Sequence, residues 1–432
     1  MKRLLYNDLL AWKKNPKRKP LILNGARQVG KTWLLKEFGR CEYASTAYIN
    51  CERTERIEEL FQDFDTQRMI TALSALSGVA VHPESTLIVL DEIQEYPRAL
   101  TALKYFCEDA PGYHVAVAGS LLGISIHQGV SFPVGKVNTM NLFPMTFSEF
   151  VQAMGKEQAA EMLRNGTFED LSSLHSFFTE YLRKYFFTGG MPAAVLEFVN
   201  SGNPHEVRAI QKQILRDYRH DFSKHTSSSE SERIAMVWDG IPQQLAKENK
   251  KFSYNDVKTG GRAKIFSLPI QWLSDAGLVS KVTRVNTPKM PLRFYEEPSV
   301  FKLFMNDVGL LGAAMDTPAQ LILLGDDAFS EYKGAFSEQF VLSQIIVSGL
   351  PVYYYTTNTS QVEIDFILQA RNGIIPIEVK SGVNVRSKSL RTFVDRHPDL
   401  TGIRFSLLPY IDQGWMKNLP LYSVENFMNQ IQ

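Results

Sequence analysis

The chain has 432 residues, of which 44% are hydrophobic and 22% are charged, and its formal net charge is +1. This length indicates two to four domains of ~100–200 residues each, and the composition is that of an ordinary globular protein. A net charge this small argues neither for nor against a nucleic-acid partner, because a local patch of charge matters more than the total.

Cysteine usage and hydropathy exclude a disulfide scaffold and a membrane-spanning protein. Cys41, Cys51 and Cys107 have neither paired nor metal-ligand spacing, so we expect reduced thiols in an intracellular protein. Residues 1–10 are too short and too polar for the apolar region of a signal peptide. No run of about eighteen apolar residues occurs. We therefore expect a cytoplasmic protein with no membrane partner.

Residues 1–20 are expected to form an N-terminal helix and a linker. Apolar residues recur with a roughly helical period over 4–12, whereas 13–19 is basic and is broken by Pro16. The basic stretch suits a solvated connector better than a contact for an acidic partner.

Residues 24–32, Asn-Gly-Ala-Arg-Gln-Val-Gly-Lys-Thr, fit the P-loop pattern G-x-x-x-x-G-K-[ST] without a mismatch. The apolar run 21–23 indicates a short buried strand before this loop. Residues 33–38 indicate a helix after it, and we expect that helix to end at Gly39. A strand, a glycine loop and a helix together form the context in which the pattern binds nucleotide.

The chemistry of the loop follows from its residue types. Glycines let backbone N–H groups turn inward around phosphate oxygens, and the helix N-terminus adds partial positive charge. We expect Lys31 to reach the β- and γ-phosphates and Thr32 to hold Mg²⁺. The expected nucleotide contacts are Gly25, Ala26, Arg27, Gln28, Val29, Gly30, Lys31, Thr32 and Asp91.

An acidic motif follows the P-loop by about sixty residues, after a strand expected at 47–49 and a mostly helical stretch over 53–76. Residues 87–92 read Leu-Ile-Val-Leu-Asp-Glu. This pattern is typical of a buried parallel strand that carries carboxylates at its C-terminal edge. We expect Asp91 to join the Mg²⁺ shell and Glu92 to orient and deprotonate the attacking water.

The next strand, expected at 115–118, ends at Gly119 and Ser120. A polar group beside the acidic strand can sense the γ-phosphate or the water, so Ser120 is a candidate catalytic residue. A helix N-cap is an alternative role for its hydroxyl. We expect a further strand at 137–142, which would be the fifth strand of an ATPase core over 21–150.

Residues 151–204 are expected to form a small helical lid. Thr146 and Glu149 have capping-box spacing at the start of this helical region. The region is rich in Leu and Phe, runs to about residue 199 and is interrupted by Gly-Gly-Met-Pro at 189–192.

The blocks GARQVGKT, LIVLDEIQ, AGS, FPMTFSEF and GGMP, in this order, resemble a prokaryotic family of AAA-type ATPases. Members of that family join the ATPase to a C-terminal domain of poorly known function, and the resemblance covers almost the whole chain. It implies a cation that completes the site against the γ-phosphate, often an arginine shortly after the sensor strand. The matching position here is Lys136, so Arg98, Lys136 and a residue from another subunit are the candidates.

The middle region, 205–330, resembles a winged helix. Residues 252–257 and 265–273 indicate two helices separated by a Gly-Gly turn, and 278–285 with 292–295 indicate a hairpin. Such a fold often places its second helix in the major groove of DNA. Only Arg262 and Lys264 are basic near that helix, so protein–protein packing is at least as well supported as DNA binding.

Residues 331–432 carry a second cluster of candidate residues. Glu338 lies in a helical stretch, residues 362–368 alternate as a half-buried strand should, and Asn372-Gly373 indicates a hairpin turn. The returning strand at 374–380 places Glu378 and Lys380 on one face.

This spacing resembles the PD-(D/E)xK nucleases, particularly the junction resolvases, in which a helix Glu precedes the strand Asp. By that resemblance Asp365 and Glu378 would bind Mg²⁺, Glu338 would assist, and Lys380 would position or activate the water. An ordinary salt-bridged strand pair is the alternative. A basic group at Arg386, Lys388, Arg391 and Arg396 suits phosphate contact or a solvated helix face.

The expected fold class is α/β: an AAA-like P-loop NTPase sheet with a helical lid, a winged-helix-like middle domain and a PD-(D/E)xK nuclease-like α/β C-terminal domain. The expected cofactors are ATP and Mg²⁺, since no guanine-reading Asn-Lys-x-Asp motif occurs. The expected function is an ATPase coupled to a nuclease-like domain that faces DNA or another nucleic acid. The alternative is a nucleotide-gated switch or scaffold for a protein partner, with a silent C-terminal domain. A small-molecule kinase is disfavoured, because nothing suggests an acceptor pocket.

Overall fold

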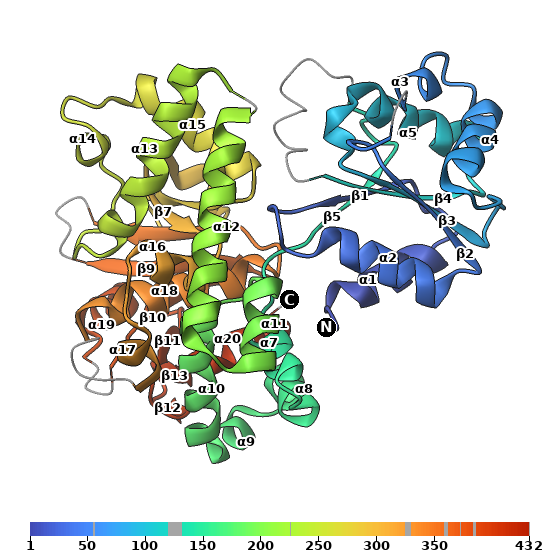
Figure 1. The fold of residues 1–432 in the computed structure, drawn as a ribbon. Coiled ribbons are helices and arrows are strands. Elements are labelled where there is room, and N and C mark those ends of the chain that lie inside the picture. The colour runs from blue at the N-terminus through green and yellow to red at the C-terminus, as the bar shows by residue number, and fades with distance from the viewer. Residues whose placement is uncertain are drawn as a thin grey trace. The chain divides into compact units, whose positions relative to one another are not determined.

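The computed structural model describes residues 1–54, 57–119, 132–224, 226–324, 330–357, 362–371, 373–382 and 386–431. By their internal contacts these residues divide into two compact units (Figure 1). Unit 1 is Met1–Phe143 with Asp275–Leu278, and unit 2 is Pro144–Ser274 with Val279–Gln432.

Unit 1 contains a five-stranded parallel sheet in the order β2-β3-β4-β1-β5. Its strands are β1 (Leu21–Asn24), β2 (Ser45–Asn50), β3 (Thr86–Asp91), β4 (His114–Ala118) and β5 (Asn138–Asn141). Because the strands are parallel, their carboxyl ends meet at one edge, where polar residues from different strands can act together. Every residue of β3 and β4 is buried, as the continuous apolar runs predict.

Helices cover both faces of this sheet, with α1 and α2 on one face and α4 and α5 on the other (Figure 1). They are α1 (Leu5–Lys14), α2 (Lys31–Glu42), α3 (Ile57–Leu60), α4 (Thr66–Ser77) and α5 (Pro97–Asp109), with the 3₁₀ turn η1 (Ile93–Glu95). A hydrophobic core that includes Ile22, Leu90 and Leu103 fills the space between sheet and helices.

Two helix boundaries in unit 1 differ from expectation. The helix after the P-loop continues past Gly39 to Glu42. A Cβ atom at Gly39 would lie 2.3 Å from Thr46 Oγ1, so this glycine permits close packing of α2 on β2 rather than ending the helix. The stretch expected to be helical over 53–76 divides into α3 and α4, because Phe64 has φ 58° and Asp65 caps α4.

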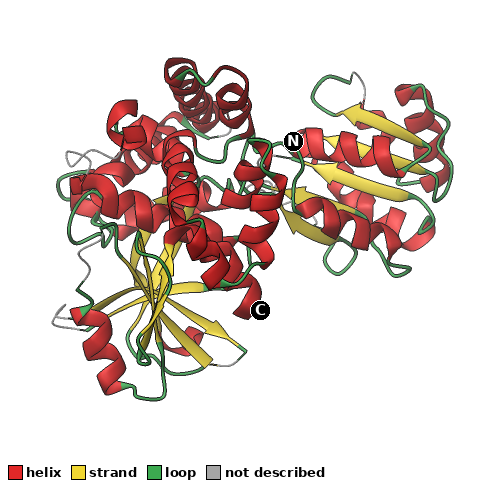
Figure 2. Ribbon diagram, turned by 90° about the horizontal axis from the view of Figure 1, so that it is seen from below, coloured by secondary structure: helices red, strands yellow, loops and turns green. Residues whose placement is uncertain are grey.

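Unit 2 contains an eight-stranded mixed sheet in the order β12-β13-β11-β10-β9-β8-β6-β7. Figure 2 shows this twisted sheet in yellow with helices packed on it. The strands are β6 (Val279–Val285), β7 (Glu296–Met305), β8 (Val352–Thr356), β9 (Glu363–Ala370), β10 (Gly373–Val379), β11 (Gly402–Ser406), β12 (Ile411–Asp412) and β13 (Met416–Pro420).

The hairpin expected to be the wing of a separate middle domain is part of this larger sheet. Strands β6 and β7 form the hairpin, and β6 also pairs in parallel with β8, with Thr283 opposite Tyr353. The two expected helices are present as α14 (Tyr254–Val257) and α15 (Ala263–Asp275). The two helices and the first strand were therefore predicted, but the returning strand is Glu296–Met305 rather than 292–295, which forms a 3₁₀ turn. The boundary at 330 does not separate two sheets.

The other helices of unit 2 precede, interrupt and follow the strands. They are α7 (Phe147–Ala153), α8 (Glu157–Asn165), α9 (Phe168–Ser173), α10 (His175–Thr188), α11 (Pro192–Ser201), α12 (Pro204–Lys224), α13 (Ser228–Leu245), α16 (Val308–Ala314), α17 (Ala319–Leu324), α18 (Ser330–Ile346), α19 (Lys388–Arg396) and α20 (Val424–Ile431), with 3₁₀ turns η2 (Leu292–Tyr295) and η4 (Leu421–Ser423). The helices expected to form a lid on the ATPase core, residues 151–204, thus belong to the compact body of unit 2.

Two of the sequence blocks meet inside unit 2. The capping box of Thr146 and Glu149 is present at the start of α7. Just before it, the Met145 backbone N–H donates to the Gly190 carbonyl at 2.7 Å. A Cβ atom at Gly190 would lie 2.2 Å from the Met145 carbonyl oxygen. The buried carboxylate of Asp307 accepts from the Gly190 N–H at 2.6 Å, so these residues clamp the start of α11.

Among the helices of the described residues, none is long and apolar enough to cross a membrane.

Candidate functional site

The P-loop lies at the carboxyl edge of the unit 1 sheet, between β1 and α2. Gly30 has φ 98° and directly precedes α2, a conformation that a residue with a Cβ atom adopts only with strain. A Cβ atom at Gly25 would lie 2.2 Å from the Leu142 carbonyl oxygen. Steric constraints in this fold therefore favour glycine at both positions of the P-loop pattern.

Lys31 points back into its own loop. Its Nζ donates to the carbonyl oxygens of Gly25 at 2.7 Å and Ala26 at 2.8 Å, and the residue is only 7% exposed. Burial lowers the pKa of Lys31 to about 8, although the charges of Glu92 and Asp91 act in the opposite direction. The ammonium group is thus held beside the concave face of the loop.

Asp91 joins the two nucleotide motifs. Its Oδ2 atom accepts from Thr32 Oγ1 at 2.8 Å and from the Tyr48 hydroxyl at 2.9 Å. Adjacent strand ends bring these side chains together, since β2 pairs in parallel with β3 and Asn50 lies opposite Asp91. Burial, followed by the charge of Asp91, raises the pKa of Tyr48 to about 12, so this hydroxyl remains a donor.

Glu92 follows the strand in an unusual backbone conformation. Its φ of 54° and ψ of 42° are left-handed, which is uncommon for a residue other than glycine, asparagine or aspartate. Gln94 Nε2 donates to Glu92 Oε2 at 2.7 Å. The sequence analysis assigned no role to Tyr48 or Gln94, although Gln94 ends the block LIVLDEIQ; Tyr48 lies in no motif. The one available signal was the position of Tyr48 in the strand paired with the acidic strand.

Ser120 lies outside the described residues. The strand that leads to it, β4, lies between β3 and β1, the position beside the acidic strand that the analysis expected.

The structure does not bring Lys136 to the P-loop of its own chain. Lys136 precedes β5, which runs parallel to β1 with Asn138 opposite Leu21, so it lies at the amino edge of the sheet. There its Nζ pairs with Glu108 at 2.8 Å. The expectation that Lys136 completes the ATP site of its own subunit is therefore corrected, because the P-loop follows β1 at the other edge.

Arg98 is also engaged elsewhere. Its guanidinium donates to the carbonyl oxygens of Phe61 at 3.2 Å and Gln62 at 2.6 Å, and it lies 5.0 Å from the ring centroid of Phe64. These contacts fix the turn between α3 and α4. The third candidate, a residue from another subunit, stays a prediction.

The C-terminal candidates converge in unit 2. Glu338 lies on α18, Asp365 on β9 and Glu378 on β10, with Lys380 just after it. Strands β9 and β10 pair with Ile377 opposite Phe366, and this register continued by one residue places Asp365 opposite Glu378. Asp365 Oδ2 accepts from the Val379 N–H at 2.8 Å, and Lys380 Nζ lies 3.1 Å from Glu378 Oε1.

Two further lysines enter this cluster from earlier parts of unit 2. Lys250, in the loop between α13 and α14, forms an ion pair with Glu338 Oε1. Lys302 on β7 is 1% exposed and pairs with Glu363 Oε1 at 2.6 Å. The sequence analysis did not include these lysines. They lie 88 and 61 positions from their partners, a separation that no local motif encodes.

The charges in this cluster perturb one another. Burial, followed by the charge of Glu338, raises the pKa of Asp365. Burial alone would also raise the pKa of Glu338, but the charges of Lys250, Lys302 and Lys380 outweigh it and lower that pKa. The carboxylate of Glu338 is therefore held ionised by ammonium groups.

The donor chemistry of the cluster suits a divalent cation, but its geometry does not. The Oε2 atoms of Glu338 and Glu378 are buried and have no hydrogen-bond partner among the described residues. Carboxylate oxygens are the ligands that Mg²⁺ prefers. Within the same described residues, however, no three His, Cys, Asp or Glu side chains are arranged to hold a metal ion. The carboxylates are gathered without forming a ligand set.

The basic residues after Lys380 lie on or just before the amphipathic helix α19. Arg386, Lys388, Arg391 and Arg396 are all exposed. Arg391 pairs with Asp395 at 2.9 Å and lies 4.9 Å from the ring centroid of Trp415. This arrangement is that of a solvated helix face whose free positions still offer positive charge.

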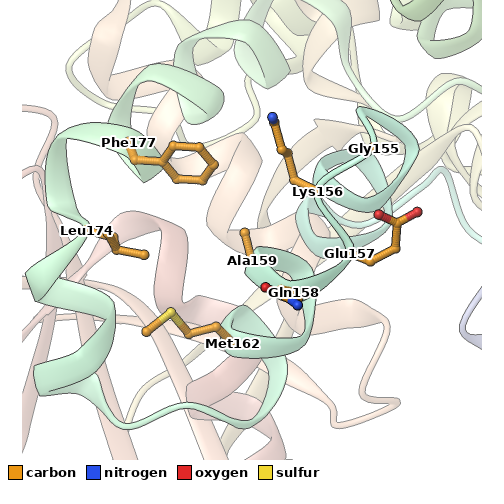
Figure 3. Close-up of a pocket in the computed structure, with 8 residues that line it drawn as sticks. All are labelled: Gly155, Lys156, Glu157, Gln158, Ala159, Met162, Leu174 and Phe177. Carbon is orange, nitrogen blue, oxygen red and sulfur yellow. The ribbon is translucent and has the colours of Figure 1, made fainter.

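An open hollow beside α8 in unit 2 has a volume of about 650 Å³ (Figure 3). The side chains around it come from the start of α8 and from the α9–α10 connection and α10. They are mainly apolar, and their polar groups do not converge on one point. Its lining is Gly155, Lys156, Glu157, Gln158, Ala159, Met162, Leu174 and Phe177. The lining of the hollow therefore does not form a catalytic site.

Three family models match separate parts of the chain. Residues 17–151 match an AAA domain, 179–321 match a domain of unknown function (DUF8612), and 333–420 match a domain of unknown function (DUF4143). The match over 17–151 and the two nucleotide motifs support an AAA-type P-loop ATPase. A comparison with curated proteins gives no match.

Solved structures with similarity to the chain include the Walker-type ATPase PABY2304 of Pyrococcus abyssi. It is 13% identical with a TM-score of 0.47, and the alignment covers 72% of this chain and 94% of that one. A STAND protein with a tetratricopeptide repeat sensor, PH0952 from Pyrococcus horikoshii, is 12% identical with a TM-score of 0.29, covering 78% and 47%. Drosophila ORC bound to DNA is 13% identical with a TM-score of 0.23, covering 72% and 84%.

Proposed function

We propose that the protein is an Mg²⁺-dependent ATPase in which Lys31, Thr32, Asp91 and Glu92 of unit 1 carry ATP hydrolysis. The observation that supports this proposal most directly is the 2.8 Å hydrogen bond between Thr32 and Asp91. It brings a residue of each nucleotide motif to one point, beside the loop that would hold the phosphates. A chance match to either pattern would not bring the two together.

Each residue has a distinct role in this proposal. Lys31 exchanges the carbonyl oxygens of Gly25 and Ala26 for phosphate oxygens, and its positive charge stabilises charge that develops on the γ-phosphate. Thr32 and Asp91 would hold Mg²⁺, which would neutralise charge on the phosphates. Glu92 orients the attacking water and accepts its proton after releasing Gln94.

A cation against the γ-phosphate is proposed to come from another subunit. In their own chain Arg98 is bonded to the turn after α3, and Lys136 lies at the opposite edge of the sheet. A homo-oligomer would supply such a group in trans. This proposal predicts that the ATPase rate per chain rises with protein concentration.

The test measures phosphate release from ATP with Mg²⁺ for wild type and Glu92→Gln. We expect hydrolysis to fall ~100-fold or more while binding of a fluorescent ATP analogue persists, because only the proton acceptor is lost. Glu84→Gln is the matched control, since Glu84 is exposed before the start of β3, at the other end of the strand. Unchanged hydrolysis in Glu92→Gln would overturn the assignment of the base.

A second candidate activity is cleavage of DNA by unit 2. The supporting observation is the convergence of Glu338, Asp365, Glu378 and Lys380, with two buried carboxylate oxygens that have no hydrogen-bond partner in the described part of the chain. By the resemblance to PD-(D/E)xK nucleases, Glu338, Asp365 and Glu378 would hold Mg²⁺ and Lys380 would position the water, but in the described residues these carboxylates do not form a ligand set, so the activity would require them to rearrange. Linear, single-stranded and branched DNA would be incubated with Mg²⁺ or Mn²⁺, with and without ATP.

Cleavage that disappears in Asp365→Ala would support this activity. If wild type hydrolyses ATP but cuts none of these substrates, the alternative of a nucleotide-gated switch for a protein partner becomes the better account. Strong salt dependence of DNA binding would favour the first function, and salt-insensitive capture of a protein the second.

A further inference from the structure

The loop between α13 and α14 turns a single side chain inward. Within residues 246–251, all of which are described, Lys250 alone is not exposed. Its side chain is 13% exposed and that of its partner Glu338 is 8% exposed. Burying two charges is costly unless each is compensated, so this ion pair needs an explanation beyond surface solvation.

Helix α18 provides the space in which the Lys250 side chain reaches Glu338. A Cβ atom at Gly334 would lie 3.8 Å from Lys250 Nζ, and Gly334 precedes Glu338 by one helical turn. The Lys250 ammonium group thus lies against the surface of α18 at Gly334, which has no side chain to block it. The loop is tied down only two residues later, where the Phe252 N–H donates to the Phe301 carbonyl at 2.8 Å. Lys250 is therefore close to an anchored point but lies on an otherwise exposed loop.

The other lysines of the cluster differ from Lys250 in this respect. Lys302 is 1% exposed on β7, the edge strand of the sheet, and Lys380 directly follows β10. Lys302 is fully buried and forms its ion pair with Glu363, and Lys380 forms its ion pair with Glu378, so neither forms an ion pair with Glu338. Lys250 can leave by a movement of its loop alone.

We propose that Lys250 is the built-in counter-ion of the carboxylate cluster, and that it and a divalent cation are alternative occupants of the space between Glu338, Asp365 and Glu378. Lys250 binds Glu338 Oε1, while Oε2 of the same carboxylate has no hydrogen-bond partner among the residues that the structure describes. A divalent cation needs these oxygens and would be repelled by an ammonium group at contact distance. This accounts for carboxylates that gather without forming a ligand set. The inference rests on the proposed cation site of unit 2.

The test measures Mn²⁺ binding to the nucleotide-free full-length chain by calorimetry. The component that disappears in Asp365→Asn defines the unit 2 site, separately from the P-loop. We expect Lys250→Met, which keeps the apolar stem and removes the charge, to bind this component ~10-fold or more tightly. Lys247→Met is the matched control. Lys247 lies on the same loop but is exposed and pairs with Asp256 at 2.8 Å, so its removal should leave the affinity at the wild-type value.

The results distinguish failure of the inference about Lys250 from failure of the proposed cation site on which it rests. Equal Asp365-dependent affinity in wild type and Lys250→Met would overturn the role of Lys250 and leave the cation site standing. No Asp365-dependent binding in either protein would overturn both.

A measurement on the wild type alone covers the case in which Lys250→Met does not fold. Amide hydrogen exchange over 246–251 should accelerate when Mn²⁺ is added, and should not do so in Asp365→Asn. Exchange that is unchanged by saturating Mn²⁺ in the wild type would overturn the inference.

Discussion

Each unit of the protein holds a lysine against oxygen atoms of its own chain, and the two lysines differ in how far along the chain those atoms lie. In unit 1, Lys31 lies five and six residues from the carbonyls of Ala26 and Gly25 that it contacts. In unit 2, Lys250 lies 88 residues from Glu338. The first arrangement forms within one loop, whereas the second exists only after distant segments have packed.

The comparison also separates two ways in which a lysine can act. In the proposed mechanism Lys31 keeps its site and changes partner, so its charge serves the reaction. In the further inference Lys250 gives up its site, so its charge opposes the ligand. Removal of the two lysines should therefore have opposite effects, and the following experiments test that difference and the framework around it.

The largest effect is expected for Lys31→Ala. Loss of the ammonium group that faces the γ-phosphate should reduce ATP hydrolysis ~100-fold or more, measured as phosphate release. Asp365-dependent Mn²⁺ binding by unit 2 should be unchanged. Lys17→Ala, at an exposed linker position, should hydrolyse ATP like the wild type. Full ATP hydrolysis by Lys31→Ala would show that Lys31 does not serve the reaction, and the proposed contrast with Lys250 would then fail.

A substitution at Gly190 should test whether unit 2 depends on its clamp. Gly190→Ala forces a Cβ atom toward the Met145 carbonyl oxygen, 2.2 Å away, and should lower the free energy of unfolding of unit 2 by about 1–3 kcal/mol in urea. ATP binding by unit 1 should persist.

Gly240→Ala provides the control for that experiment. A Cβ atom at Gly240 on α13 meets its nearest neighbour, Gln244, at 3.5 Å, which is an ordinary contact. This variant should be neutral or more stable. Equal stability of the two variants would show that the Gly190 contact does not matter.

The Asp307 carboxylate should make the stability of unit 2 depend on pH. Burial raises the pKa of Asp307 to about 6, although its bonds to the N–H groups of Gly190 and Leu310 act in the opposite direction. The raised value means that stability is fully present below the unfolded pKa, about 3.8, and is lost as pH rises through about 6. We expect a loss of about 1–3 kcal/mol between pH 4 and pH 7.

Asp307→Asn isolates this contribution from those of other buried carboxylates. The variant should lose an acceptor and be less stable at low pH, but its stability should fall less between pH 4 and pH 7 than that of the wild type. Parallel pH profiles from chemical denaturation would contradict the prediction.

The smallest effect is expected for Tyr48→Phe. The lost hydroxyl is one of two donors that orient Asp91 Oδ2, and Thr32 remains. We expect the Mg²⁺ concentration for half-maximal ATP hydrolysis to rise ~2–5-fold, or about 0.4–1 kcal/mol, which is less than the ~1.5 kcal/mol of a hydrogen bond to a charged group because Thr32 still orients Asp91. A change in the maximal rate alone would instead assign Tyr48 to the chemical step.

The sequence predicted the parts of this protein that are local. The P-loop pattern between a buried run and a helix fixed the position of Lys31 and Thr32, and the acidic strand end fixed Asp91. The capping box of Thr146 and Glu149 was likewise predicted, because all its contacts fall within four residues. Each of these signals depends on neighbours in the chain.

What the sequence did not predict depends on strand order. Lys136 was a candidate because the family resemblance implies a cation shortly after the sensor strand, but strand β5 pairs with β1 and places Lys136 at the amino edge of the sheet. Tyr48 reaches Asp91 only because β2 and β3 are neighbours. The first strand of the hairpin β6–β7 was predicted and the second was expected at 292–295, just before its actual start, whereas the pairing of β6 with β8 joins regions about seventy residues apart. Pairings over such distances leave no periodicity to detect.

The parallel pairing of β6 with β8 also determines how this chain can be divided. The two matched domains of unknown function, 179–321 and 333–420, contribute strands to one sheet, so a cut between them would leave β8 on one fragment and β6 on the other. Each fragment would then present a row of unpaired backbone groups, which is a template for aggregation. Residues 144–432 kept together should be soluble, whereas a fragment that begins at 331 should precipitate or require a partner strand.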